Sequence, residues 1–222
     1  MEFNTAQDAF EHYYFKIVSE GKTLENTKFL RHQGFYIKNP LDNEIKTPWR
    51  KWSYDYALQE WSWYLSGNRS VSEIKKKAKI WDTMHKGDDI VNSNYGYQWQ
   101  RNGQLSYVIN ELIRNPLSRR AVLTIYDAKE HQEYEKDTPC TLNIIFDVDN
   151  KALNMTVLMR SNDLWYGFCN DQFCFSNLQS HIANVLGIEI GWYYHFAHNL
   201  HLYNKDLNKH DDFYLKIKED KQ

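Results

Sequence analysis

The sequence predicts an α+β fold in which helices pack on a largely hairpin-connected sheet. Three observations predict it. Several segments repeat apolar residues at helical spacing, and other short segments are apolar and bounded by turn residues. The two kinds of segment intermix along the chain. No Pro-, Gly- or Ser-rich linker divides them, so we expect one domain over residues 1–222.

The N-terminal half predicts three helices and one strand. Residues 6–20 carry apolar side chains at helical spacing, and residues 29–37 are strand-like. Residues 49–65 predict a long aromatic helix, because a Ser-Gly-Asn turn follows them. Residues 71–78 predict a short helix whose lysines form a solvated face.

The C-terminal half predicts two helices and four mostly adjacent strands, followed by a polar tail from Asn208. Asn115-Pro116 ends one helix, Asp149-Asn150 joins a hairpin and Gly187 closes the last helix. The predicted helices are residues 104–114 and 171–186, and the predicted strands are residues 121–126, 141–147, 152–159 and 190–203.

Composition limits the function classes. Lys and Arg number 27 and Asp and Glu number 29, a formal net charge of −2. We therefore expect no stable nucleic-acid binding, which needs a basic excess. The start carries no signal segment, and no apolar run approaches the roughly 20 residues that span a bilayer. We therefore expect a soluble protein, and the sparse cysteines favour a reducing, cytoplasmic setting.

Three cysteines, an odd and sparse set, do not predict a disulfide framework, and no spacing predicts a metal site. Cys140 follows a proline and opens a predicted strand. A lone cysteine is usually buried and inert, and the alternative is a thiolate nucleophile whose pKa nearby cations lower. Glu60 lies among aromatic residues of a predicted helix, so it either faces solvent or is desolvated and suited to proton transfer.

Two arginine-containing pairs could bind a phosphate group. Arg119 and Arg120 precede a predicted strand, where neighbouring side chains point to opposite sides, and Arg160 and Ser161 end another. Each pair alone is more often a surface feature. Asn199, His201 and Tyr203 alternate along an extended segment, and they form either a polar outer face or a row that binds sugar hydroxyls.

Taken together, these segments resemble the thymidylate synthase family from about Trp49 to Tyr203. Any one is weak, but the ordered set is specific. The matching phrases are Gln59-Glu60-Trp61-Ser62-Trp63-Tyr64-Leu65-Ser66-Gly67, Ile80-Trp81-Asp82, Asn94-Tyr95-Gly96-Tyr97-Gln98-Trp99, Asn115-Pro116-Leu117-Ser118-Arg119-Arg120, Pro139-Cys140, Arg160-Ser161-Asn162-Asp163 with Gly167, and His201-Leu202-Tyr203.

The resemblance implies a thymidylate synthase-like fold whose large mixed sheet forms a homodimer interface. It implies that Cys140 adds to C6 of a pyrimidine nucleoside monophosphate, and that 5,10-methylenetetrahydrofolate supplies a one-carbon unit without any metal. The implied roles are proton handling for Glu60 and Tyr95, the folate site for Trp81, Asp163 and Gly167, phosphate binding for Arg160, Ser161 and the partner subunit's Arg119 and Arg120, and sugar binding for His201 and Tyr203.

Asp171 departs from the synthase pattern, which has a uracil-reading asparagine eight residues after the pterin aspartate. A carboxyl group accepts from the cytosine amino group and, when protonated, also satisfies N3, whereas a carboxylate facing uracil O4 sets acceptor against acceptor. Asp171 therefore predicts a cytidylate substrate, as in the phage deoxycytidylate hydroxymethylases that this segment resembles. Asp171 could also be the N-cap of the following helix.

Three further departures follow. Thr141 replaces the usual histidine after the cysteine, and Lys22 is the best substitute for an early phosphate-binding arginine. The charged tail, ending Lys218-Glu219-Asp220-Lys221-Gln222, lacks the apolar end that closes synthase sites, which favours hydration of the one-carbon unit.

The resemblance therefore predicts a deoxycytidylate 5-hydroxymethyltransferase in bacterial or phage-infected cytoplasm. The alternatives are a methyltransferase that makes 5-methylcytidylate or thymidylate, a CMP-specific hydroxymethylase, and a nucleotide-binding or translational-repressor protein without turnover.

Overall fold

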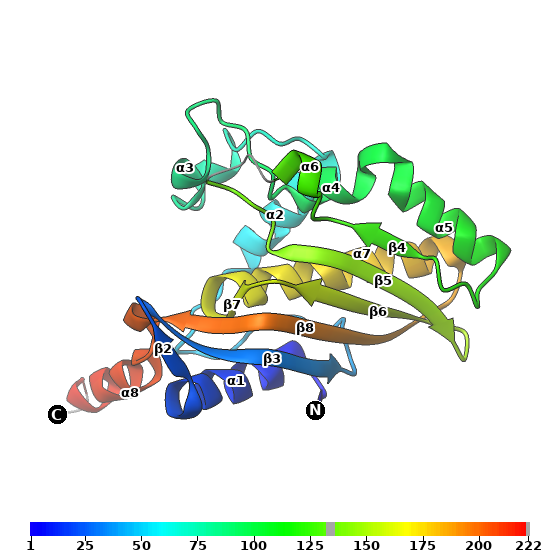
Figure 1. Cartoon of the computed structure of the whole chain (residues 1–222). Helices are drawn as coiled ribbons and strands as arrows, with labels where there is room; N and C mark the ends of the chain where they lie inside the picture. Colours follow the sequence, from blue (N-terminus) through cyan, green and yellow to red (C-terminus); the bar gives the residue numbers. More distant parts are fainter. Residues whose placement is uncertain (132–135, 221–222) are drawn as a thin grey trace.

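The computed structural model describes residues 1–131 and 136–220, whose eight strands form one mixed sheet (Figure 1). Strand β8 is antiparallel to β3 on one side and parallel to β6 on the other. The short strands β2 and β7 pair with β3 and β8. In the order of the sheet, the strands are β1 (Glu2–Phe3), β3 (Thr27–Ile37), β8 (Glu189–Tyr203), β6 (Ala152–Met159), β5 (Thr141–Asp149) and β4 (Val122–Thr124), with β2 (Lys22–Leu24) and β7 (Asn162–Asp163) beside this path.

The helices pack mainly against one face of this sheet. Figure 1 shows α7 running behind β5 and β6, and α7 joins the parallel strands β6 and β8. The sheet is therefore less hairpin-connected than we expected. The helices are α1 (Ala6–Glu20), α2 (Tyr54–Ser66), α3 (Trp81–Met84), α4 (Tyr95–Gln100), α5 (Gln104–Arg114), α6 (Ala128–His131), α7 (Cys169–Leu186) and α8 (Lys209–Glu219), with shorter turns η1 (Ile74–Lys76), η2 (Arg101–Gly103), η3 (Leu164–Phe168) and η4 (Asn204–Asp206).

Several predicted boundaries are wrong for identifiable reasons. Helix α2 begins at Tyr54 rather than at residue 49, because the Ser53 side chain caps it by accepting from the Tyr56 N–H. Within residues 71–78 only the short turn η1 is helical. The polar tail contains α8, which we did not predict, and residues 221 and 222 of that tail lie outside the described residues.

The start of α7 also differs from the prediction. Its first residue is Cys169, and the π-helical turn η3 leads directly into it. The Asp163 side chain caps this turn by accepting from the Trp165 N–H at 2.8 Å. Asp171 therefore lies inside the first turn of α7, and its expected role as N-cap is wrong.

The alternation of side chains along β8 changes phase near its middle. Tyr193, His195 and Ala197 are buried, but further along the strand Leu200 and Leu202 are the buried positions. On β3, at the corresponding point, His32 has φ 54°, a left-handed conformation that interrupts regular pairing. The phase change turns both His195 and Leu200 toward the core.

The second face of the sheet is half-buried and largely apolar. Tyr36 and Tyr194 meet with ring centroids 4.6 Å apart, and Leu158 and Phe196 lie beside them at paired positions of β6 and β8. Within the described residues, none of the helices has both the length and the apolar character that crossing a membrane requires.

Candidate active site

A cavity of about 850 Å³ opens near the C-terminal end of β8 and the start of α7. Asp163 and Tyr203 are the two predicted site residues that line it. Its wall also contains residues from the β2–β3 turn, from α2 and from the region of α3. These are Asn26, Tyr56, Ala78, Lys79, Ile80, Met84, Tyr166, Asn170, Asn204 and Lys205. The mixture of aromatic, aliphatic and polar groups suits a flat heterocycle with polar edges.

Cys140 immediately precedes β5 and is half-buried. Burial raises the pKa of its thiol to about 11, Arg160 opposes the rise, and the nearby carboxyl groups of Asp171, Asp137 and Asp163 add to it. The expected lowering of this pKa by cations is therefore wrong for the protein alone. One cation acts in the predicted direction, but desolvation outweighs it.

The Arg160 side chain holds the segment that leads to Cys140. Its Nε donates to the Pro139 carbonyl at 3.0 Å, and its Nη2 donates to the Thr138 carbonyl at 2.7 Å. The Arg160 N–H also bonds the Cys140 carbonyl at 2.9 Å. Arg160 is otherwise exposed, and Ser161 beside it is half-buried.

The predicted acids Glu60, Asp163 and Asp171 all have raised pKa values; Asp163 lines the cavity, Asp171 acts on Cys140, and Glu60 acts on Asp171. Burial raises the pKa of Glu60 to about 7 and that of Asp163 to about 7. Burial, and then repulsion from Glu60, raise the pKa of Asp171 well above its ordinary value. The raised pKa favours the neutral acid of Asp171, which accepts a hydrogen bond from Asn162 Nδ2 at 2.9 Å.

Tyr56 links two predicted site residues that are far apart in the sequence. Its hydroxyl accepts a hydrogen bond from Trp81 Nε1 at 2.9 Å and donates one to Glu60 Oε1 at 3.1 Å. The other oxygen, Glu60 Oε2, is buried without a protein partner. We did not predict Tyr56, although its spacing of four residues from Glu60 on a predicted helix would have indicated it.

Tyr95 is buried at the start of α4, with its ring stacked on Phe175 at a centroid distance of 5.6 Å. Burial raises its pKa well above the ordinary value, and the charges of Asp171 and Cys140 add to the rise. Tyr95 therefore shares one electrostatic environment with the cysteine and the acid of α7.

A thymidylate synthase family model matches residues 12–220 of the chain. The chain belongs to the thymidylate synthase family. The α+β fold and the resemblance inferred from the sequence are thereby confirmed.

Individual relatives include both phage and bacterial proteins. The deoxyuridylate hydroxymethyltransferase of Pseudomonas phage M6 is 34% identical over 163 residues, covering 69% of this chain and 46% of the relative. The deoxyuridylate hydroxymethyltransferase of Bacillus phage SP01 is 28% identical over 226 residues, covering 93% and 57%. The thymidylate synthase of Lactococcus lactis strain IL1403 is 24% identical over 174 residues, covering 75% and 62%. The chain thus spans about half the length of the two phage relatives.

The predicted phosphate ligands of this thymidylate synthase family member do not all meet at the cavity. Lys22 is exposed on β2, and Arg119 is exposed before β4. Arg120 forms an ion pair with Glu111 at 2.8 Å within the same chain. None of the three lines the cavity of about 850 Å³.

The predicted sugar ligands lie at the end of β8. Tyr203 lines the cavity, and burial and then the charges of Asp163 and Cys140 raise the pKa of its hydroxyl. His201 is half-buried, burial lowers its pKa, and its Nδ1 has no protein partner. Gly167, expected at the folate, lies beside the Asn162–Asp171 hydrogen bond: a Cβ there would lie 3.0 Å from Asn162 Nδ2.

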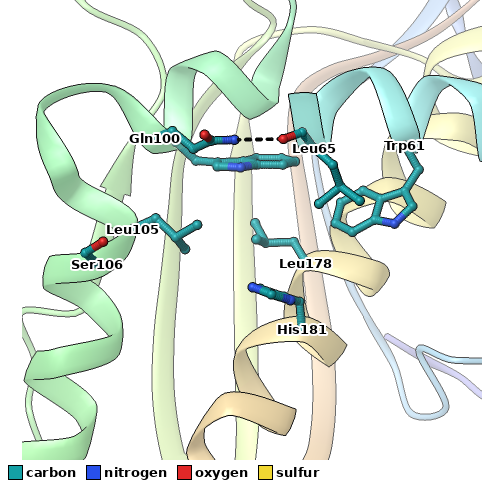
Figure 2. Close-up of a pocket in the computed structure, with 8 residues that line it drawn as sticks. Trp61, Leu65, Gln100, Leu105, Ser106, Leu178 and His181 are labelled. Atoms are coloured by element: carbon teal, nitrogen blue, oxygen red, sulfur yellow. Dashed lines mark hydrogen bonds between the residues drawn. The ribbon is translucent and has the colours of Figure 1, made fainter. Parts of the chain in front are cut away.

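A second cavity, of about 370 Å³, lies among α2, α4, α5 and α7 (Figure 2). Trp61 and Leu65 enter it from α2, and Gln100 closes one side by donating to the Leu65 carbonyl at 3.5 Å. None of the predicted site residues lines this cavity. Among residues 1–131 and 136–220, no group of three potential metal ligands occurs either.

Proposed function

We propose that the protein is a deoxycytidylate 5-hydroxymethyltransferase, converting dCMP, 5,10-methylenetetrahydrofolate and water to 5-hydroxymethyl-dCMP and tetrahydrofolate. Asp171 carries the proposal. Its raised pKa favours a neutral acid, which offers one donor and one acceptor. These groups match N3 and the amino group of cytosine, and the hydrogen bond from Asn162 supports a fixed orientation.

In the proposed reaction, Cys140 Sγ forms a bond to C6 of the ring and loses its proton. Electron density then develops at C5, which forms the new carbon–carbon bond. The folate supplies the one-carbon unit at the oxidation level of formaldehyde. Loss of the C5 proton and departure of tetrahydrofolate leave a methylene group on C5. Water then adds to this methylene, and elimination of Cys140 restores the C5–C6 double bond. Glu60 suits the proton transfers because its pKa lies near neutrality.

We propose that the cavity of about 850 Å³ receives the folate. Tyr56 and Tyr166 supply aromatic surface, Trp81 holds Tyr56 through its hydrogen bond to the Tyr56 hydroxyl, and Asp163 supplies a carboxyl group for the ring edge. The pKa of Asp163, about 7, allows this group either to accept or to donate a hydrogen bond at neutral pH. His201 and Tyr203 would bind the sugar of the nucleotide.

We further propose a homodimer built on the half-buried second face of the sheet, with the chain acting as a single domain over residues 1–222. The apolar character of Tyr36, Leu158 and Phe196 supports such an interface. Arg119 and Arg120 of one protomer would join Lys22, Arg160 and Ser161 of its partner around the phosphate. Arg119 and Arg120 are exposed and do not line the cavity of their own chain, which supports this arrangement.

A second candidate is a deoxyuridylate hydroxymethyltransferase, which the names of the two phage relatives favour. A third is a methyltransferase, which the name of the Lactococcus relative favours. The three candidates differ in the base of the substrate or in the product, so one experiment separates them.

The test incubates the purified protein with methylenetetrahydrofolate and dCMP, CMP or dUMP in parallel, and measures product masses and folate absorbance. The proposal expects hydroxymethylated dCMP and no absorbance rise from dihydrofolate. A hydroxymethyl product from dUMP alone supports the second candidate, and a methyl product with dihydrofolate supports the third. Unchanged tritium in 5-tritiated dCMP and dUMP would instead indicate binding without turnover.

A further inference from the structure

A chain of four hydrogen-bonded groups runs from the core to Asp171. The Tyr193 hydroxyl lies 2.8 Å from His195 Nδ1, and His195 Nε2 lies 3.1 Å from Asn162 Oδ1. Asn162 Nδ2 then donates to Asp171 Oδ2 at 2.9 Å. Tyr193, His195 and Asn162 are buried, whereas Asp171 is half-buried. The first three groups therefore act on the site only through Asp171.

The orientation of the Asn162 amide, with Nδ2 toward Asp171, gives the chain one direction. Burial lowers the pKa of His195 to about 3, so its ring is neutral and carries one N–H. The Asn162 carbonyl can only accept, so that N–H is on Nε2, and Nδ1 accepts from Tyr193. Burial raises the Tyr193 pKa well above its ordinary value, so the hydroxyl keeps its hydrogen. Every donor thus points toward Asp171 Oδ2.

This direction determines where neutral Asp171 carries its proton. Oδ2 already accepts from Asn162, and the carbonyl oxygen of a neutral acid is a better acceptor than its hydroxyl oxygen. This hydrogen bond therefore favours the proton on Oδ1. A reversed amide would require Oδ2 to carry the proton, the other His195 tautomer and Tyr193 as acceptor.

The position of this proton matters because neutral aspartic acid can pair with either base. Cytosine presents an amino donor at C4 and an acceptor at N3, whereas uracil presents an acceptor at O4 and a donor at N3. An acid with its proton on one oxygen matches cytosine, and the same acid with its proton on the other oxygen matches uracil. Residue identity at position 171 alone therefore leaves the choice open.

We propose that Asn162, His195 and Tyr193 are positioning residues that confine the Asp171 proton to Oδ1, and that this chain selects cytosine over uracil. The inference rests on the proposed function, because it requires the ring to meet Asp171 with N3 toward Oδ1 and the amino group toward Oδ2. Gly167 leaves the necessary space, since a Cβ there would lie 3.0 Å from Asn162 Nδ2 and 3.3 Å from Asp171 Oδ2.

The test compares kcat/KM and Kd for dCMP and dUMP in the wild type, Asn162→Leu and Tyr193→Phe. Leucine has nearly the volume of asparagine and neither donates nor accepts. Phenylalanine removes only the hydroxyl that donates to His195 Nδ1 at the far end of the chain, and it serves if the first variant does not fold. Tyr13→Phe, which removes a buried hydroxyl from α1, is the matched control.

Asn162→Leu should reduce the dCMP-to-dUMP ratio about ten- to a hundredfold, partly by improving dUMP turnover. Tyr193→Phe should reduce it less, and Tyr13→Phe should leave it unchanged. An unaltered ratio in both folded network variants overturns the inference but not the proposed function. A wild type that prefers dUMP overturns the cytidylate assignment instead, and the network then retains its role only if these variants shift that preference.

Discussion

The Tyr56 hydroxyl donates a hydrogen bond to Glu60 Oε1 at 3.1 Å, and the two residues lie one turn apart on α2. Trp81 Nε1 donates to the same hydroxyl at 2.9 Å. The hydrogen bond from Tyr56 lowers the Glu60 pKa, while burial raises it to about 7. Tyr56 therefore couples the acid to a residue expected at the folate, and it stabilises the ionised form of that acid.

Replacing Tyr56 by phenylalanine should move the acid limb of the pH–rate profile upward. The wild-type limb should fall near pH 7, where Glu60 titrates, and the lost hydrogen bond should raise that pKa further. Measuring kcat/KM against pH checks this. Tyr54→Phe, an exposed tyrosine on the same helix, is the control. A limb that stays in place would show that Glu60 does not limit the reaction.

Glu60 should also make stability depend on pH. The pKa of Glu60 rises on folding from 4.5 to about 7. The contribution of its neutral form to folding stability is therefore complete below pH 4.5 and is lost as the pH rises through 7. Glu60→Gln should therefore be more stable than the wild type by about 3 kcal/mol at about pH 8, and nearly equal at about pH 4. Urea unfolding at both pH values measures the difference. An advantage that is the same at both would contradict the assigned pKa.

Asp171→Asn should shift base preference from dCMP toward dUMP. The amide can present a donor to uracil O4, where neutral Asp171 presents the acceptor Oδ2, and we expect a change in the kcat/KM ratio of about tenfold or more. Parallel assays with both nucleotides give this ratio. If the variant retains the wild-type ratio, Asp171 does not read the base.

Cys140→Ser should abolish turnover and preserve nucleotide binding. A serine hydroxyl is a far weaker nucleophile at neutral pH, so kcat should fall about a thousandfold or more. The phosphate and sugar ligands remain, and the Kd for dCMP should stay within about threefold of the wild type. Cys169→Ala removes another thiol near Asp163 and Asp171 and serves as the control. Substantial activity in Cys140→Ser would exclude covalent addition by this sulfur.

Mixing two inactive variants tests the contribution of arginines across the interface. One variant carries Arg119→Ala and Arg120→Ala, and the other carries Cys140→Ser. If the arginines act on the partner's site, each mixed dimer contains one intact site, and an equal mixture should regain about a quarter of wild-type activity. Unmixed variants are the controls. A mixture as inactive as its components would show that the arginines act within their own chain.

The sequence predicted some elements closely because local signals determine them. Helices α1 and α5 have their predicted bounds, and the Thr5 capping box begins α1 at Ala6. Strand β6 also has its predicted bounds. The phase change in β8 carries no comparable local signal, because it coincides with the unusual backbone of His32 on the neighbouring strand.

For the site, the sequence by itself determined the family and the identities of its reactive groups. The ordered motifs around Cys140 and Asp163 can be read from the sequence without knowing which residues are close in space. The acid at position 171 stands out as a departure from these motifs. We did not predict Tyr56 and His195 as site residues, because they lie outside the motifs of the family.

Only the tertiary structure decided the protonation and orientation of those groups. The pKa of Cys140 lies high because folding buries it among carboxyl groups, and Asp171 is oriented by Asn162, whose own partner, His195, is 33 residues away in the sequence. Desolvation and hydrogen-bond direction depend on which distant segments meet, and a linear pattern of residues does not contain that information.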